Sequence, residues 1–162
     1  IGATEGEAVL RLNSANPTVA TASTDFIAAA QGAPGWEGQV WDAEIPLPRT
    51  TLDALIAAHG MPDFVKIAVE GWEAEVLAGL SRAPRALSFE FTTIQRGVAL
   101  ASLDRLTALG FRHFNASLGE SMEWAFPNAV KAASMADWLR ALPDGANSGD
   151  IYASGAAWRL KD

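Results

Sequence analysis

Short apolar runs alternate with segments of helical spacing from residue 50 onward, and this alternation restricts the fold more than any other feature of the chain. Residues 63–69 are rich in β-branched side chains, and residues 86–93 form a second apolar run. Helical spacing is found before and between these runs, at residues 51–60 and 73–80. Strands and helices in this order are typical of crossover units, so we predict an α/β fold with a mainly parallel sheet.

The ends of the other elements are predicted from caps and turn residues. Thr50 or Thr51 can cap the helix at 51–60, which Gly60 ends, and Ser134 can cap a helix at 135–142. Residues 31–38, rich in Gly, and residues 118–128 are predicted to be loops. Further strands are predicted at 8–12, 39–47, 111–116 and 150–153, and further helices at 25–30 and 102–109.

The composition excludes several classes of protein. The 162 residues carry a net charge of −7, so no basic surface is available for nucleic acid or an anionic membrane. The absence of Cys excludes disulfides, thiolate metal sites and a Cys nucleophile. No apolar run approaches the roughly 20 residues of a membrane span, and the first residues contain no basic leader. We expect a single cytoplasmic domain.

The segment from Lys66 to Gly71 is the strongest candidate for a functional site. Side chains alternate along a strand, so Lys66, Ala68 and Glu70 are expected on one face. Glu70 and Gly71 follow at the carboxyl end of this strand, where ligands bind in open α/β sheets. Glu90 lies near the end of the next predicted strand. We therefore predict that the carboxylates of Glu70 and Glu90 project toward one crevice.

Simpler interpretations stay open for the neighbouring residues. Glu73 and Glu75 suit the positive end of a helix dipole and need no functional role. Lys66 can extend its charged end to solvent or form an ion pair with Glu70, and Trp72 stands at the mouth of the predicted crevice.

No metal site is predicted from the sequence. His59 and His113 are far apart and lack the spacing of metal ligands. The alternative is a divalent cation held between Glu70 and Glu90.

Residues 50–80, TTLDALIAAHGMPDFVKIAVEGWEAEVLAGL, resemble the FkbM family of S-adenosylmethionine-dependent methyltransferases. The hallmark of that family is a Lys-Ile-Asp-Val-Glu-Gly strand, followed by a Glu-rich helix start and a Val-Leu-x-Gly-Leu ending. Residues 4–13, 87–91, 106–111 and 149–153 also resemble family segments. The positions that match the hallmark are Lys66, Ile67, Val69, Glu70, Gly71, Glu73, Val76, Leu77, Gly79 and Leu80.

The resemblance implies a three-layer class I methyltransferase sheet, which is Rossmann-like, and this chain would supply mainly strands 4-5-7-6 with flanking helices. It implies S-adenosylmethionine as the cofactor and methyl transfer to a hydroxyl of a sugar or natural-product acceptor. On this basis we assign Lys66, Gly71 and Trp72 to cofactor binding. We assign Glu70 and Glu90 to acceptor orientation or base catalysis.

Two departures from the family pattern lead to further expectations. Ala68 occupies the catalytic position at which the family has aspartate, and a methyl group cannot accept a proton. The family's glycine-rich loop and ribose-binding acid have no counterpart in this chain, which begins at Ile1 without Met. We expect residues 1–162 to be the C-terminal part of the domain, with the N-terminal cofactor-binding half absent. The alternative is a catalytically silent methyltransferase-like module that binds a partner or ligand.

The strand at 63–69 also has a consequence for assembly. In the class I sheet it pairs with a strand that this chain lacks, so its backbone edge would be unpaired. We expect the missing half or a second copy of the chain to cover that edge. A flavodoxin-like binding domain is disfavoured, because no phosphate loop precedes a helix.

Overall fold

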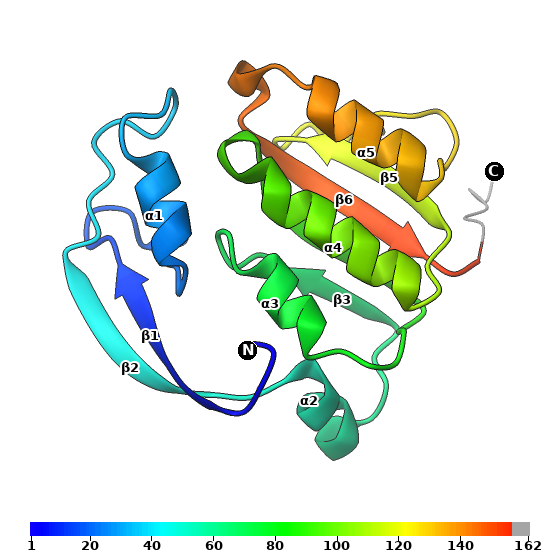
Figure 1. The fold of residues 1–162 in the computed structure, drawn as a ribbon, viewed down its shortest axis with the longest axis horizontal. Coiled ribbons are helices and arrows are strands. Elements are labelled where there is room, and N and C mark those ends of the chain that lie inside the picture. The colour runs from blue at the N-terminus through cyan, green and yellow to red at the C-terminus, as the bar shows by residue number, and fades with distance from the viewer. Residues whose placement is uncertain (157–162) are drawn as a thin grey trace.

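In the computed structural model, which describes residues 1–156, a four-stranded sheet forms the centre of the molecule (Figure 1). The α/β fold class is confirmed. The strand order is β3-β4-β6-β5, and it agrees with the order 4-5-7-6 when β3 is counted as strand 4. The strands are β3, Phe64–Ile67; β4, Ala86–Thr92; β5, His113–Leu118; and β6, Ser148–Ser154.

The prediction of a mainly parallel sheet is wrong. β3 and β4 are parallel, whereas β6 is antiparallel to both of its neighbours, β4 and β5. After β5 the chain returns along the outer side of that strand, where Ala125 bonds to Ala116 and Val130 bonds to Phe114. The helix α5, Ala132–Ala141, follows, and β6 begins at the same edge of the sheet at which β4 ends. Because this return precedes α5, β6 runs opposite to its neighbours.

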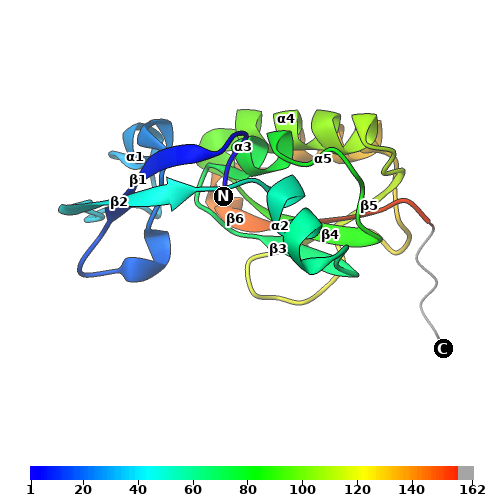
Figure 2. The same ribbon diagram turned by 90° about the horizontal axis from the view of Figure 1, so that it is seen from below.

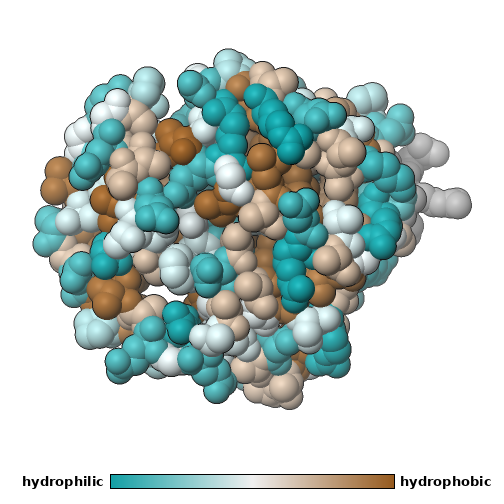
Figure 3. Space-filling view, in the orientation of Figure 1, coloured by the Kyte–Doolittle hydropathy of each residue, from teal (hydrophilic) through white to brown (hydrophobic). Residues whose placement is uncertain are grey.

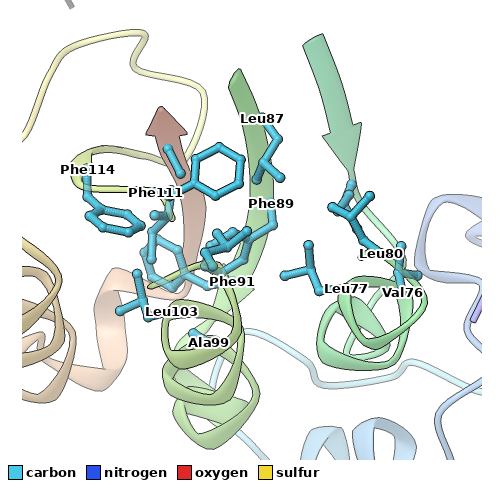
Figure 4. Close-up of a cluster of buried hydrophobic side chains, with 14 of the residues drawn as sticks. Val76, Leu77, Leu80, Leu87, Phe89, Phe91, Ala99, Leu103, Phe111 and Phe114 are labelled. Atoms are coloured by element: carbon cyan, nitrogen blue, oxygen red, sulfur yellow. The ribbon is translucent and has the colours of Figure 1, made fainter. Parts of the chain in front are cut away.

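One face of the sheet carries the main apolar core. The helices α3, Glu73–Ala78, and α4, Arg96–Ala108, lie with α5 on that face (Figure 2). Leu87, Phe89 and Phe91 alternate along β4 and are buried toward Leu77 of α3 and Leu103 of α4 (Figure 4). Each buried side chain of this size contributes about 1.5–3 kcal/mol, so this face supplies most of the stabilisation.

The opposite face of the same strands carries polar side chains. The strand register places Lys66 beside Ser88 and Ser88 beside Tyr152, and it places Glu90 beside Asp150. The sheet therefore separates an apolar, helix-covered side from a side rich in groups that titrate or form hydrogen bonds.

The predicted helices are present, but their predicted ends are accurate only where a capping residue marks them. In α2, Leu52–His59, the Thr51 hydroxyl accepts the N–H of Ala54 at 3.0 Å, and Gly60 ends the helix with φ of 91°. α4 begins six residues earlier than the predicted 102–109, at Arg96, because its cap residue Gln95 offers no side-chain bond that the sequence would reveal. The prediction that Ser134 caps α5 is wrong, since the helix begins at Ala132 and includes it.

The N-terminal unit, residues 6–49, forms a second and smaller group of elements (Figure 1). The strands β1, Gly6–Leu12, and β2, Ala43–Arg49, pair as an antiparallel ribbon, and Arg11 of β1 also forms a single bridge with Thr21. The helices η1, Pro17–Val19, and α1, Thr24–Ala30, lie between them in the chain, and Ser23 caps α1. Four apolar side chains are buried in this unit: Val19, Phe26, Ala30 and Trp36.

The N-terminal unit packs against the carboxyl edge of the sheet. Ile94 of η2, Thr93–Gln95, joins its small apolar cluster. Trp36 Nε1–H donates a hydrogen bond of 3.0 Å to Oδ1 of Asn147, which follows η3, Asp144–Ala146. The β1–β2 ribbon is less well covered, since Ile45 and Leu47 are about two-fifths exposed at 41% and 42%. The space-filling view shows an opening beside the ribbon (Figure 3).

Within residues 1–156, no helix combines the length and the apolar character that crossing a membrane requires.

Candidate active site

The chain makes a tight turn at Glu70 and Gly71, directly after β3. β3 ends at Ile67 rather than at the predicted residue 69, so the strand alternation does not extend to Glu70. Glu70 and Gly71 both have left-handed backbones, with φ of 50° and 84°. Gly71 is required sterically as well, because a Cβ at this position would lie 2.2 Å from Oε1 of Gln95 and 2.8 Å from Cβ of Phe26.

Glu70 and Glu90 line one small cavity at the carboxyl edge of the sheet, together with Gly71, Glu73 and Gln95. The space open to the centre of a water molecule is about 10 Å³, which is room for about one water. The structure thus brings the two predicted carboxylates together and adds a third carboxyl group beside them.

Glu73 is the carboxyl group that the sequence left with a simple helix-dipole role. Its side chain is 3% exposed, and Oε1 accepts the backbone N–H of Val69 at 3.1 Å. Glu75, in the same helical turn, is exposed, as a dipole residue can be. Glu73 therefore closes the turn after β3, whereas Glu75 faces solvent.

Burial and mutual repulsion disfavour the charged forms of these carboxyl groups. Burial raises the pKa of Glu70 to about 8, with further contributions from the negative charges of Glu90 and Glu73 and an opposing one from Lys66. Burial also raises the pKa of Glu90, where Lys66 again opposes the shift, and that of Glu73, where the Val69 N–H opposes it. At neutral pH Glu70 is therefore mostly a neutral carboxylic acid.

Protonation decides what chemistry the cavity can perform. A neutral Glu70 carboxyl can donate a proton or a hydrogen bond at pH 7, and it can accept a proton only once the pH approaches about 8. Carboxyl groups in close proximity whose environments change their proton affinity are typical of acid–base sites.

The other predicted site residues lie outside this cavity. Lys66 Nζ forms an ion pair with Asp150 on the polar face of the sheet, so its predicted pairing with Glu70 is wrong. Lys66 and Ala68 line a separate groove of about 170 Å³ along the free side of β3. Trp72, at the N-terminus of α3, packs against the main core and is not among the residues that line either hollow.

The family profile described as the Methyltransferase FkbM domain matches residues 2–115, which is more than two thirds of the chain and includes the turn at Glu70 and Glu90. The chain belongs to this family. The expected resemblance is therefore confirmed, and methyltransferase is the activity class that the family indicates. No curated protein sequence matches the chain.

The matched range contains the whole N-terminal unit as well as β3 and β4. The ribbon and α1 are therefore parts of the FkbM domain itself. The match ends at Asn115, inside β5, and α5, η3 and β6 lie beyond it.

Neither the carboxyl cavity nor either of two further hollows is large enough to enclose S-adenosylmethionine. Ligand pockets for molecules of such size measure about 300–1,000 Å³. The carboxyl cavity offers about 10 Å³, the groove along β3 about 170 Å³, and a third hollow beside Ser117 and Tyr152 about 230 Å³. The carboxyl cavity is also lined by Glu70, Glu73 and Glu90, whose carboxyl groups do not suit the carboxylate end of the cofactor. These residues can form at most one wall of a cofactor site.

No group of three or more His, Asp or Glu side chains within residues 1–156 is arranged to hold a metal ion. The alternative of a cation between Glu70 and Glu90 therefore gains no third ligand from this part of the FkbM domain.

Two residues of the site have no signal in the sequence. Gln95 lies beyond the end of β4, and its Oε1 is buried without a hydrogen-bond partner within the described residues. Thr21, 49 positions before Glu70, donates a hydrogen bond of 2.6 Å from its hydroxyl to the Glu70 carbonyl oxygen. Neither contact follows from residue type or spacing, because each depends on the tertiary path of the chain.

Proposed function

We propose that this chain contributes the acid–base wall of an S-adenosylmethionine-dependent O-methyltransferase of the FkbM type, with a hydroxyl group of a sugar or natural product as the acceptor. The observation that carries the proposal is the pair of carboxyl groups, Glu70 and Glu90, that lines one cavity at the carboxyl edge of β3 and β4. Ligands of open α/β sheets bind at this edge.

Glu70 and Glu90 have different parts in the proposal. A hydroxyl that becomes an ether loses its proton, so a carboxylate within reach is useful as the acceptor. Burial raises the pKa of both groups, but Lys66 is the second-largest influence on Glu90 and the smallest on Glu70, whose pKa the carboxyl groups of Glu90 and Glu73 help to raise to about 8. Glu90 is therefore the proposed proton acceptor near neutral pH, and the neutral Glu70 carboxyl donates a hydrogen bond that orients the acceptor oxygen.

The test is transfer of a labelled methyl group from S-adenosylmethionine to a panel of sugars and natural-product alcohols. Replacement of Glu90 by Gln is expected to lower the rate by about 10²-fold or more, the ordinary contribution of a positioned base. The matched control is Glu75→Gln, because Glu75 is an exposed acid in the first turn of α3. Equal rates for Glu90→Gln and Glu75→Gln would contradict the proposal.

Covering the free side of β3 is a separate part of the proposal. β3 pairs with β4 on one side, and the groove on its other side is lined by apolar residues that include Ile1, Leu52 and Val76. An open strand edge of this kind favours pairing with another strand. Further protein, either from the same polypeptide or from a second copy, would there complete the wall around the cofactor. Light scattering of the isolated chain at rising concentration tests the second-copy form.

Ala68 favours a second candidate, a methyltransferase-like module that binds a partner without catalysis. Its exposed methyl group stands on the groove where the family has aspartate, and that groove, at about 170 Å³, is smaller than a cofactor pocket. Calorimetric titration with S-adenosylmethionine, carried out with the protein that covers the free side of β3 present, distinguishes the two candidates. Absence of binding by the chain and by an Ala68→Asp variant would favour the silent module.

A further inference from the structure

Thr21 is held rigidly at the junction between the N-terminal unit and the sheet. Its side chain is 1% exposed, and its backbone forms hydrogen bonds in both directions with Arg11 of β1, at 2.7 and 3.0 Å. The hydroxyl oxygen accepts the N–H of Ser23 at 2.9 Å, which directs the hydroxyl proton toward the Glu70 carbonyl oxygen. Every polar group of Thr21 is thereby engaged, and one of them is committed to the candidate active site.

The carbonyl that Thr21 binds belongs to a strained residue. Glu70 has φ of 50°, a conformation that costs a non-glycine residue about 1–3 kcal/mol unless its surroundings hold it. Gly71 is fixed from the same side, because the Phe26 side chain of α1 packs against it. The N-terminal unit thus contacts both residues of the turn, Glu70 through Thr21 and Gly71 through Phe26.

A second left-handed residue at this edge is held in the same manner. Asn147 has φ of 61°, and its carbonyl oxygen accepts the N–H of Thr93 at 2.7 Å. Its side chain accepts the Trp36 indole N–H. Glu70 and Asn147, on the two sides of the junction, thus both have a positive φ and a carbonyl oxygen that accepts a hydrogen bond. This is expected if the hydrogen bonds stabilise the positive φ.

We infer that Thr21 is a positioning residue for Glu70: its hydroxyl holds the turn after β3 in the left-handed conformation that directs the Glu70 carboxyl into the cavity with Glu73 and Glu90. The inference rests on the proposed function for its catalytic consequence, but its structural part does not. Without the hydroxyl, the turn relaxes toward ordinary backbone and the carboxyl moves toward water.

The surroundings of Glu70 make that movement measurable. The charged groups that act on it are Lys66 of β3, Glu73 of α3 and Glu90 of β4, while α1 and η2 present the uncharged Phe26 and Gln95. Burial is the largest cause of its raised pKa. A carboxyl that leaves the cavity therefore titrates at lower pH, and the position of Glu70 can be followed without any turnover.

The experiment compares Thr21→Val, which removes the hydroxyl but keeps the shape, with Thr21→Ser, which keeps the hydroxyl. The matched control is Thr18→Val, because Thr18 is exposed and its hydroxyl bonds only to Asn16 in the same segment. The readout is the ¹³C NMR titration of the Glu70 carboxyl, assigned with Glu70→Gln. The midpoint is expected near pH 8 in the parent chain, in Thr21→Ser and in Thr18→Val, and at least one pH unit lower in Thr21→Val. An unchanged midpoint in a folded Thr21→Val protein would overturn the inference.

A second variant covers the case in which Thr21→Val does not fold. Glycine adopts left-handed backbone without strain, so in Glu70→Gly the turn does not require the hydrogen bond from Thr21. If Thr21→Val does not fold in the parent background, it is expected to fold in the Glu70→Gly background, as measured by far-UV circular dichroism, and an unfolded protein in both backgrounds would overturn the inference.

The pH–rate profile separates this inference from the proposed function. If methyl transfer is observed, its pH profile is expected to shift with the NMR midpoint in Thr21→Val, with kcat affected more than KM. If no transfer is observed even with the protein that covers the free side of β3 present, the proposed function fails and the titration still decides the role of Thr21.

Discussion

The sheet and the N-terminal unit differ in how each is stabilised. Within residues 1–156, nineteen buried hydrophobic residues form one continuous core beneath the sheet, whereas four form the cluster of the N-terminal unit. The β1–β2 ribbon pairs Leu10 with Ile45 and Ala8 with Leu47 on one face, and much of that face remains exposed. A two-stranded ribbon alone is marginally stable in water. The N-terminal unit therefore depends on its junction with the sheet, and the sheet does not depend equally on the N-terminal unit.

The comparison explains where the candidate site lies. The carboxyl groups of Glu73 and Glu90 stand on elements of the stable sheet layer. The turn at Glu70 is held from the other side by Thr21 and Phe26 of the less stable unit. Regions of low local stability are those that open first, so this arrangement makes one carboxyl group of the site more mobile than the other two.

The largest expected effect is in the sheet core. Phe89→Ala removes a fully buried ring from β4 and is expected to lower the free energy of unfolding by about 3–5 kcal/mol. Chemical denaturation followed by far-UV circular dichroism measures it. Phe64→Ala is the control, since Phe64 is 47% exposed and its loss should cost less than about 1 kcal/mol. Equal losses at both positions would mean that this core does not dominate stability.

Phe26→Ala tests whether the N-terminal unit can open alone. The ring is fully buried and packs edge-on against Trp36, with 5.0 Å between the ring centroids. Its loss is therefore expected to lower the free energy of unfolding of that unit by about 3–5 kcal/mol. Amide hydrogen exchange is expected to lose protection in residues 6–49 while β4 and β6 keep theirs. Ala28→Ser, on the exposed side of α1, is the control. Equal loss of protection in β4 would show that the two regions unfold as one.

Glu70→Gln tests the electrostatics of the junction. Between pH 4.5 and about 8 the folded chain holds a proton on Glu70 that the unfolded chain has released, so the stability of the parent chain falls as the pH rises through this window. Gln does not titrate, and partial solvent screening reduces the effect. The variant is therefore expected to match the parent near pH 4 and to exceed it by about 1–3 kcal/mol at pH 9, as measured by urea denaturation. Identical pH dependence in the two proteins would contradict the burial of this carboxyl.

The smallest effect concerns one hydrogen bond across the junction. Trp36→Phe removes the indole N–H bonded to Asn147 and is expected to cost about 1 kcal/mol. Trp41→Phe removes a similar bond of 2.9 Å to the Val19 carbonyl oxygen, inside the N-terminal unit. Hydrogen exchange at residues 147–149 is expected to increase in Trp36→Phe and to stay unchanged in Trp41→Phe. The same increase in both would remove Trp36 from the contacts that join the regions.

Local signals account for the parts of the fold that were predicted from the sequence. α2 lies where it was predicted because Thr51 and Gly60 mark its ends through bonds and dihedral angles within one turn. The beginning of α4 was missed because Gln95 offers no such bond. The direction of β6 was missed because it depends on the return of residues 119–130 along β5, a path that local periodicity does not encode.

The candidate site was predictable to the same extent. Glu70, Gly71 and Glu90 follow from strand ends and from the family hallmark. The burial of Glu73 and the bond from Thr21 arise only when distant segments meet, and the ion pair of Lys66 with Asp150 joins residues 84 positions apart. Position and residue type predict which residues lie at an edge, whereas their partners are set by tertiary packing.

The two outer strands of the sheet, β3 and β5, differ in whether their outer edge can pair with a further strand. The outer side of β5 already bonds to Ala125 and Val130, while β3 pairs with β4 alone among residues 1–156. Any polypeptide that lengthens this sheet must therefore enter beside Ile67, three residues before Glu70. A strand added there would lie only a few residues from the carboxyl turn, so growth of the sheet and the candidate site share one edge of the molecule.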